Sequence, residues 1–98
     1  MPPKPSDKKR LKLLIETVSA IKPPQELADF LQDLCTPAEL ESLADRWEVA
    51  QLIDAGENYR DIAEKTGIST TTITRVGRSL KYGTGGYKKA ISKSHKLA

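Results

Sequence analysis

The sequence has few of the residues on which disulfide-stabilised, metal-binding and catalytic proteins depend. Among its 98 residues there is one cysteine, Cys35, and one histidine, His95. A lone cysteine excludes an intramolecular disulfide and leaves no second thiol for a metal site, so a reducing interior is the natural setting. No acidic residue follows Glu64 to orient His95. We therefore expect no enzyme activity, no catalytic residue, no metal site and no built-in cofactor.

Long apolar runs are also missing. No stretch approaches the ~20 apolar residues that a membrane span requires. The first ten residues, MPPKPSDKKR, lead into a periodic helix pattern rather than the apolar region of a signal peptide. We expect a cytoplasmic protein with no membrane partner.

Acidic residues are absent from the last third of the chain, and the charge is strongly segregated. Residues 1–13 carry five basic residues and one acid, residues 14–64 carry three basic and twelve acidic, and residues 65–98 carry eight basic and no acidic. The net charge of +3 hides this polarity. A basic face of this kind attracts a polyanion and releases its counterions, which favours nucleic acid as a partner.

Apolar residues recur at three- and four-residue steps, which predicts an all-α protein. The sequence predicts a helix over Asp7–Ile21, a second from Pro24, a long one over Thr36–Ala55 and a short closing one over Tyr87–Lys93. Thr36, Pro37 and Glu39 form a strong helix start with a capping box. As domains we expect a flexible arm at 1–5, a single helical domain at 6–93 and a flexible tail at 94–98.

The stretch Asn58–Leu80 is typical of a helix-turn-helix. Ala63 is small enough for a close helix crossing, Gly67 permits a turn with positive φ, and Asn58 and Ser69 are suited to cap the two helices. The apolar residues expected to join the helices are Ile62, Ile68, Ile73 and Val76. The GTGG segment at 83–86 lacks the ending of a nucleotide-binding loop, so we interpret it as a helix break.

The second of these helices presents short hydroxyl side chains followed by arginines, which suits an element entering the DNA major groove. We expect the DNA-binding residues to be Arg60, Ser69, Thr70, Thr71, Thr74, Arg75, Arg78 and Lys81. Within this set, Arg60 and Lys81 are assigned to the DNA backbone. The alternative is an ordinary helical hairpin whose threonines cap a helix and whose arginines are solvated.

The long helix has an apolar arc that is wider than one neighbouring helix covers. Its apolar residues are Leu40, Leu43, Ala44, Trp47, Val49, Ala50, Leu52 and Ile53. A chain of this size cannot enclose such an arc alone, which predicts a homodimer. Two subunits also suit a DNA reader that grips half-sites about 34 Å apart.

Two segments, LCTPAELESLADRW and LIDAGENYRDIAEKTGISTTTITRVGRSLK, resemble the Trp repressor family. The resemblance covers Asp33–Lys81, and the later YGTGGYKKAI is more similar to the YerC/YecD branch than to the tryptophan-sensing repressors. It implies an intertwined, all-helical homodimer in which the N-terminal helices of one subunit wrap the other.

The resemblance also implies a place for a small-molecule effector. Thr36, Arg46, Arg75 and Ser79 match the positions that hold L-tryptophan in members that sense it. Val76 stands where those members carry glycine and is expected to crowd the pocket, so binding of L-tryptophan is doubtful and the identity of any corepressor stays open. An intersubunit contact for Arg46 and a phosphate contact for Arg75 are the alternatives.

The sequence therefore predicts a sequence-specific, dimeric transcriptional regulator, most simply a repressor, that binds double-stranded DNA and is open to control by an effector. The alternative from another class is a protein-interaction module that uses the helix-turn-helix as a scaffold without specific DNA reading. Binding to duplex DNA that weakens steeply with salt distinguishes the first from the second.

Overall fold

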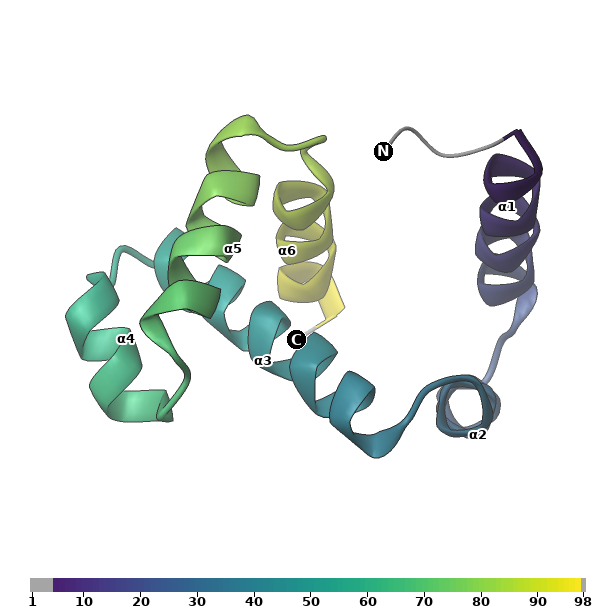
Figure 1. The fold of residues 1–98 in the computed structure, drawn as a ribbon, viewed down its shortest axis with the longest axis horizontal. Helices are drawn as coiled ribbons and strands as arrows, with labels where there is room; N and C mark the ends of the chain where they lie inside the picture. Colours follow the sequence, from purple (N-terminus) through teal and green to yellow (C-terminus); the bar gives the residue numbers. More distant parts are fainter. Residues whose placement is uncertain (1–4, 98) are drawn as a thin grey trace. The chain divides into compact units, whose positions relative to one another are not determined.

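The computed structural model describes residues 5–97, with side chains for residues 7–94 (Figure 1). Within that range every regular element is a helix, which confirms the predicted all-α class. The helices are α1 (Pro5–Ala20), α2 (Pro24–Leu34), α3 (Pro37–Asp54), α4 (Tyr59–Thr66), α5 (Thr70–Tyr82) and α6 (Gly86–Leu97). No helix in the described part of the chain is both long and apolar enough to span a membrane.

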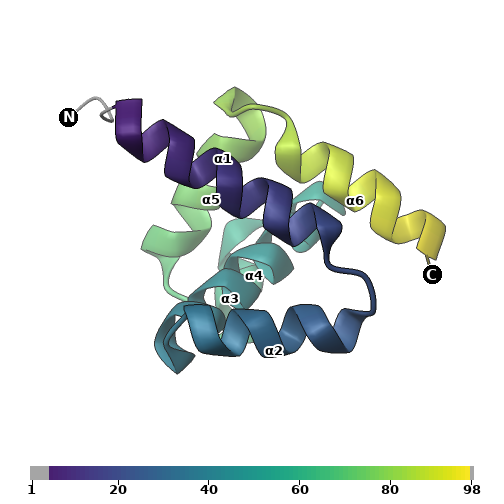
Figure 2. The ribbon, with the colours of Figure 1, turned by 90° about the vertical axis from the view of Figure 1, so that its right-hand side faces the viewer.

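The chain divides into two units, residues 1–40 and 41–98. The first contains α1 and α2, which Figure 2 shows as separate helices joined by a short loop. Pro24 opens α2, as expected of a residue whose missing N–H costs nothing there. The arm predicted at residues 1–5 lies outside the described residues except for Pro5, where α1 already begins.

The capping box at the start of α3 forms as predicted. The Glu39 amide donates to Thr36 Oγ1 at 3.1 Å, and the Thr36 amide donates to Glu39 Oε1 at 2.8 Å. These hydrogen bonds lower the pKa of the Glu39 carboxyl, the bond from the Thr36 backbone having the larger effect. Two of the orphan amides at this helix start are thereby satisfied.

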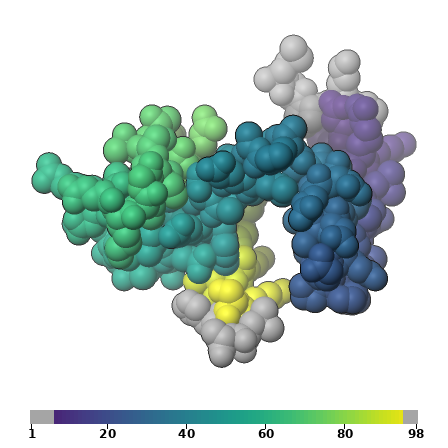
Figure 3. Space-filling model, turned by 90° about the horizontal axis from the view of Figure 1, so that it is seen from below, coloured from purple at the N-terminus to yellow at the C-terminus, as the bar shows by residue number. Residues whose placement is uncertain are grey.

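A small apolar core holds the second unit together. Val49 and Ala50 from α3, Ile62 from α4, and Ile73 and Val76 from α5 are all at most 1% exposed and form one cluster. In the space-filling view the green atoms of α5 lie directly against the teal atoms of α3 and α4 (Figure 3). The three predicted helix-turn-helix isoleucines and Val76 thus pack as expected, with Ile68 partly buried at the edge of the cluster.

The N-caps of α4 and α5 and the turn between these helices form as predicted. The Asn58 side chain accepts from the Asp61 amide at 2.8 Å, and the Ser69 hydroxyl accepts from the Thr72 amide at 3.2 Å. Gly67 ends α4 with φ +74° in the left-handed region. These caps set where α5 begins, and so which of its residues face outward.

The connection from α5 to α6 depends on glycine at two places. A Cβ on Gly83 would lie 2.4 Å from the Ser79 carbonyl oxygen, and Gly85 has φ +86°. The GTGG segment is therefore a helix break, as interpreted. The closing helix α6 begins at Gly86 and runs to Leu97, beyond the predicted end at Lys93, because no glycine or proline follows Gly86 to stop it. Ala98 and the side chains of 95–97 lie outside the description.

Candidate nucleic-acid interface

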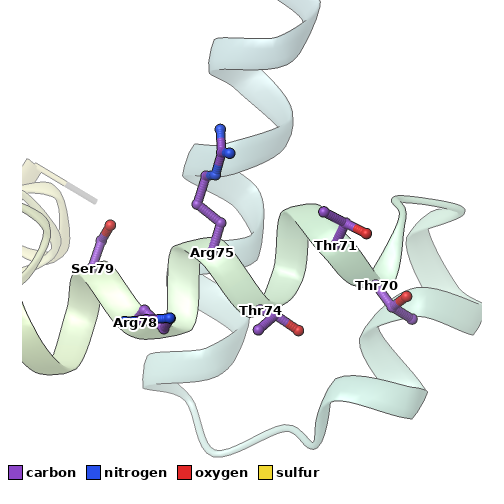
Figure 4. A pocket seen from close by; sticks show the side chains of 6 residues that line it. All are labelled: Thr70, Thr71, Thr74, Arg75, Arg78 and Ser79. Carbon is purple, nitrogen blue, oxygen red and sulfur yellow. The ribbon is translucent and has the colours of Figure 1, made fainter. Parts of the chain in front are cut away.

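The outward face of α5 carries a shallow groove. A hollow of about 600 Å³ is lined by six residues, labelled in Figure 4: Thr70, Thr71, Thr74, Arg75, Arg78 and Ser79. All six are exposed. Five of them belong to the predicted DNA-binding set, and the structure brings these five together on one helix. The groove offers hydroxyl groups at the N-terminal half of α5 and guanidinium groups further along.

The remaining predicted DNA-binding residues lie around this groove. Ser69 is exposed, but its hydroxyl is engaged as the α5 cap, accepting from the Thr72 amide and lying 3.0 Å from Thr72 Oγ1. Arg60 is exposed on α4. Lys81 is exposed near the end of α5 and lines a different hollow. Because Ser69 is committed to capping, its remaining capacity toward DNA is smaller than that of Thr70 or Thr71.

Two of the four predicted effector residues meet in a smaller hollow between α3 and α5. Arg46 and Arg75 line a space of about 220 Å³ together with Ser42, Thr71 and Thr72. Arg46 Nε donates to the Ser42 carbonyl at 3.4 Å, and Figure 4 shows Arg75 extending toward α3. Two guanidinium groups on one small space make it strongly electropositive.

The other two predicted effector residues have different surroundings. Ser79 lines the α5 groove rather than the arginine hollow. Thr36 belongs to the first unit, where its hydroxyl closes the capping box of α3. Val76 is 1% exposed in the core and is not among the residues that line the arginine hollow. The expectation that its methyl groups fill that space therefore differs from the structure, because packing against Ile62 and Ile73 turns Val76 inward.

Sequence reasoning missed the contact that sets how α5 lies on α4. Gly77 is buried on α5, and a Cβ there would fall 1.9 Å from Tyr59 Oη and 2.9 Å from Tyr59 Cζ. Tyr59 is the first residue of α4 and packs against the core cluster. A glycine in a helix interior costs roughly 1 kcal/mol relative to alanine, and this was the available signal that Gly77 serves a close approach.

Clusters of metal-binding side chains do not occur among the residues that the structure describes. The threonines, serines and arginines that line the groove and the arginine hollow supply hydrogen-bonding hydroxyls and fixed positive charge. Such groups bind phosphate oxygens and the edges of bases.

Comparison with known proteins gives a consistent family match. The model of the family described as Trp repressor protein matches residues 9–95. The chain is 41% identical over 85 residues to YerC of Bacillus subtilis, a protein described as uncharacterized, covering 87% of this chain and 82% of that one. It is 38% identical over 68 residues to a Trp operon repressor homolog of Chlamydia caviae, covering 68% and 67% of the two chains.

Two crystal structures share the fold. A TrpR-like protein from Eubacterium eligens superposes with a TM-score of 0.84 at 41% identity, over 89% of this chain and 90% of that one. A putative Trp repressor from Staphylococcus aureus gives the same TM-score at 34% identity, over 89% and 87%. The similarity thus extends over nearly the whole helical chain.

Replacing Gly77 with alanine should destabilise the protein by about 1–3 kcal/mol, because the new methyl group displaces the Tyr59 ring. With Tyr59→Ala already present, Gly77→Ala should instead be neutral or stabilising by up to ~1 kcal/mol, since alanine is the better helix former. Urea unfolding of the two single variants and the double variant measures this coupling. An equal effect of Gly77→Ala in both backgrounds would show that the contact does not constrain α5.

Proposed function

Because this chain belongs to the Trp repressor family, we propose that it is a transcriptional regulator that binds a specific double-stranded DNA sequence as a homodimer, most simply as a repressor. The family is one of regulators and not of enzymes. The observation that carries the proposal is the exposed groove along α5, which combines threonine hydroxyls with two arginines.

The arrangement of the groove supports major-groove reading. In helix-turn-helix proteins the N-terminal residues of the second helix reach base edges, and a major groove about 12 Å wide admits one helix. Thr70, Thr71 and Thr74 occupy the first half of α5 and suit base edges or phosphate. Arg78 is long enough to fork onto guanine, while Arg75, which also lines the arginine hollow, suits phosphate.

The charge distribution supports the same partner. All eight charged residues from Lys65 onward are basic, and the groove lies within that block. Each phosphate neutralised by such a residue releases counterions, so affinity should depend steeply on salt. A protein-interaction module that used this helix pair as scaffold would not require hydroxyls and arginines to gather on one exposed face.

Exposed apolar side chains support the homodimer. Leu11, Leu13 and Ile15 on α1 are 56%, 62% and 56% exposed, and Leu43 on α3 is 47% exposed. Single exposed leucines are ordinary, but Leu11 and Ile15 stand four positions apart on the same side of α1 and form an apolar face that water disfavours. A second copy of the chain covers this face in the proposed assembly, which also presents two α5 helices to two half-sites.

The arginine hollow is the candidate site for a small-molecule effector. The space of about 220 Å³ is smaller than the roughly 300–1,000 Å³ that is usual for small-molecule pockets. We therefore infer that L-tryptophan is not the ligand of this protein.

Arg78→Ala should weaken binding to the selected operator by about 1–3 kcal/mol and relax the preference at one base position, because a forked arginine–guanine contact is lost. Arg60→Ala is the matched comparison and should weaken binding equally on all sequences, with a shallower salt dependence. Selection from random duplexes, followed by fluorescence anisotropy at several salt concentrations, measures both. Salt-insensitive absence of binding by the wild type would contradict the proposed function.

Sedimentation at micromolar concentration should give a dimer. Leu11→Gln should weaken association, because about 1.5–3 kcal/mol of burial is lost from each subunit, and a symmetric interface counts the loss twice. Lys12→Gln, at the neighbouring exposed position, is the control and should leave the dimer intact. A folded wild-type monomer at this concentration would rule out the proposed assembly.

Calorimetric titration with L-tryptophan should show no binding in the micromolar range. The cation–π attraction of two guanidinium groups for an indole amounts to about 1–2 kcal/mol per contact when desolvated, and only if the ring fits between them. A dissociation constant of tens of micromolar or tighter would show that the arginine hollow opens enough to take the ring.

A further inference from the structure

The aromatic side chain of Tyr82 lies in solvent. This tyrosine is the last residue of α5 and is 82% exposed, the highest value among the exposed large hydrophobic side chains of the described residues. The other two tyrosines, Tyr59 and Tyr87, pack against the core cluster. An aromatic ring that stays in water on a folded protein is a frequent sign of a contact with a partner.

The helical register places Tyr82 on the face of α5 that carries the groove. Thr71, Arg75, Arg78 and Tyr82 are spaced by four, three and four residues, which is one stripe along a helix. Tyr82 therefore extends the groove by one turn toward the C-terminal end of α5. In homeodomains, whose third helix enters the major groove, this end of the helix contacts the DNA backbone.

Lysines surround this end of α5. Lys81 and Lys88 line one hollow together with Tyr82, over a floor that includes Gly77 and Leu80. Asp54 is the one acidic residue in that lining, so two lysines outnumber it. Neither lysine takes part in an ion pair among the described residues, and no acidic residue follows Glu64. The patch thus carries uncompensated positive charge next to a flat aromatic ring.

The fold holds Lys88 close to the reading helix. Helix α6 contacts α5, and the two helices lie side by side in Figure 1 and meet at their connection in Figure 2. Ile91 is buried at 4% exposure and Tyr87 packs against the core cluster, so α6 is anchored by two of its side chains. A lysine carried by an anchored helix makes its contact without the cost of ordering a loop.

We propose that Tyr82, Lys81 and Lys88 form an outer patch that binds the sugar–phosphate backbone of the duplex beyond the base pairs read by the α5 groove. The inference rests on the proposed function and deepens it. The lysine ammonium groups neutralise phosphates, the tyrosine hydroxyl donates to a phosphate oxygen, and its ring packs on deoxyribose. The patch reads no sequence, so it lengthens the bound site without changing the preferred bases.

Tyr82→Ala and Lys88→Gln, tested on operator duplexes with long and with trimmed flanks, check the proposal. On long duplexes each variant should bind several-fold more weakly than the wild type, and Lys88→Gln should reduce the slope of log affinity against log salt by about 1. On trimmed duplexes the difference from the wild type should vanish. Tyr82→Phe should fall between wild type and Tyr82→Ala, because it keeps the ring.

Lys12→Gln removes the same charge from α1 and should leave both the affinity and the salt slope unchanged. Thermal melting checks that the variants fold. We expect them to fold, because an exposed side chain such as Tyr82 contributes little to the core. A contrary result is that Tyr82→Ala and Lys88→Gln each bind long duplexes as tightly as the wild type while Arg78→Ala still binds them more weakly. That result would overturn the outer patch and leave the proposed function intact. Absence of duplex binding by the wild type would overturn both.

Discussion

The burial of five apolar side chains from α3, α4 and α5 is the interaction on which the rest of the second unit, residues 41–98, depends. Val49, Ala50, Ile62, Ile73 and Val76 make a cluster that water does not reach. Burying each of the valine and isoleucine side chains contributes about 1.5–3 kcal/mol to the stability of the fold. The short helices α4 and α5 would not be stable alone. The cluster therefore decides which face of α5 stays exposed.

This constraint explains why neighbouring residues on α5 have opposite environments. Val76 is turned into the core, while Arg75 before it faces the groove and the arginine hollow. Moving α5 by even part of a turn would bury a guanidinium and expose an isoleucine, which is costly on both counts. The core thus holds the groove-bearing face of α5 in register, and Gly77 under Tyr59 limits how far α5 can shift.

Acidic and basic residues are also unevenly distributed along the chain. The acidic residues lie in the first two thirds of the chain, whereas every charged residue of α5 and α6 in the described part of the chain is basic. Because these two helices are in contact, their positive charges act on a polyanion together rather than singly.

The sequence by itself determined the helices, their caps and the turn. The capping box at Thr36 and Glu39, the cap at Asn58 and the left-handed Gly67 are local features, set by residues within a few positions of one another, and they form as predicted. The inward isoleucines and the exposed groove residues follow from helical periodicity. The family match over residues 9–95 agrees with the resemblance in the helix-turn-helix segment.

Only the tertiary structure decided which residues from different helices meet. That Arg46 and Arg75 share a hollow which Val76 does not line, that Ser79 faces the α5 groove, and that Tyr59 occupies the space above Gly77 all depend on how α3, α4 and α5 cross. The exposure of Tyr82 beside Lys88 likewise depends on the path of the glycine turn into α6. Helix crossing is set by packing between residues distant in sequence, which periodicity along one helix does not encode.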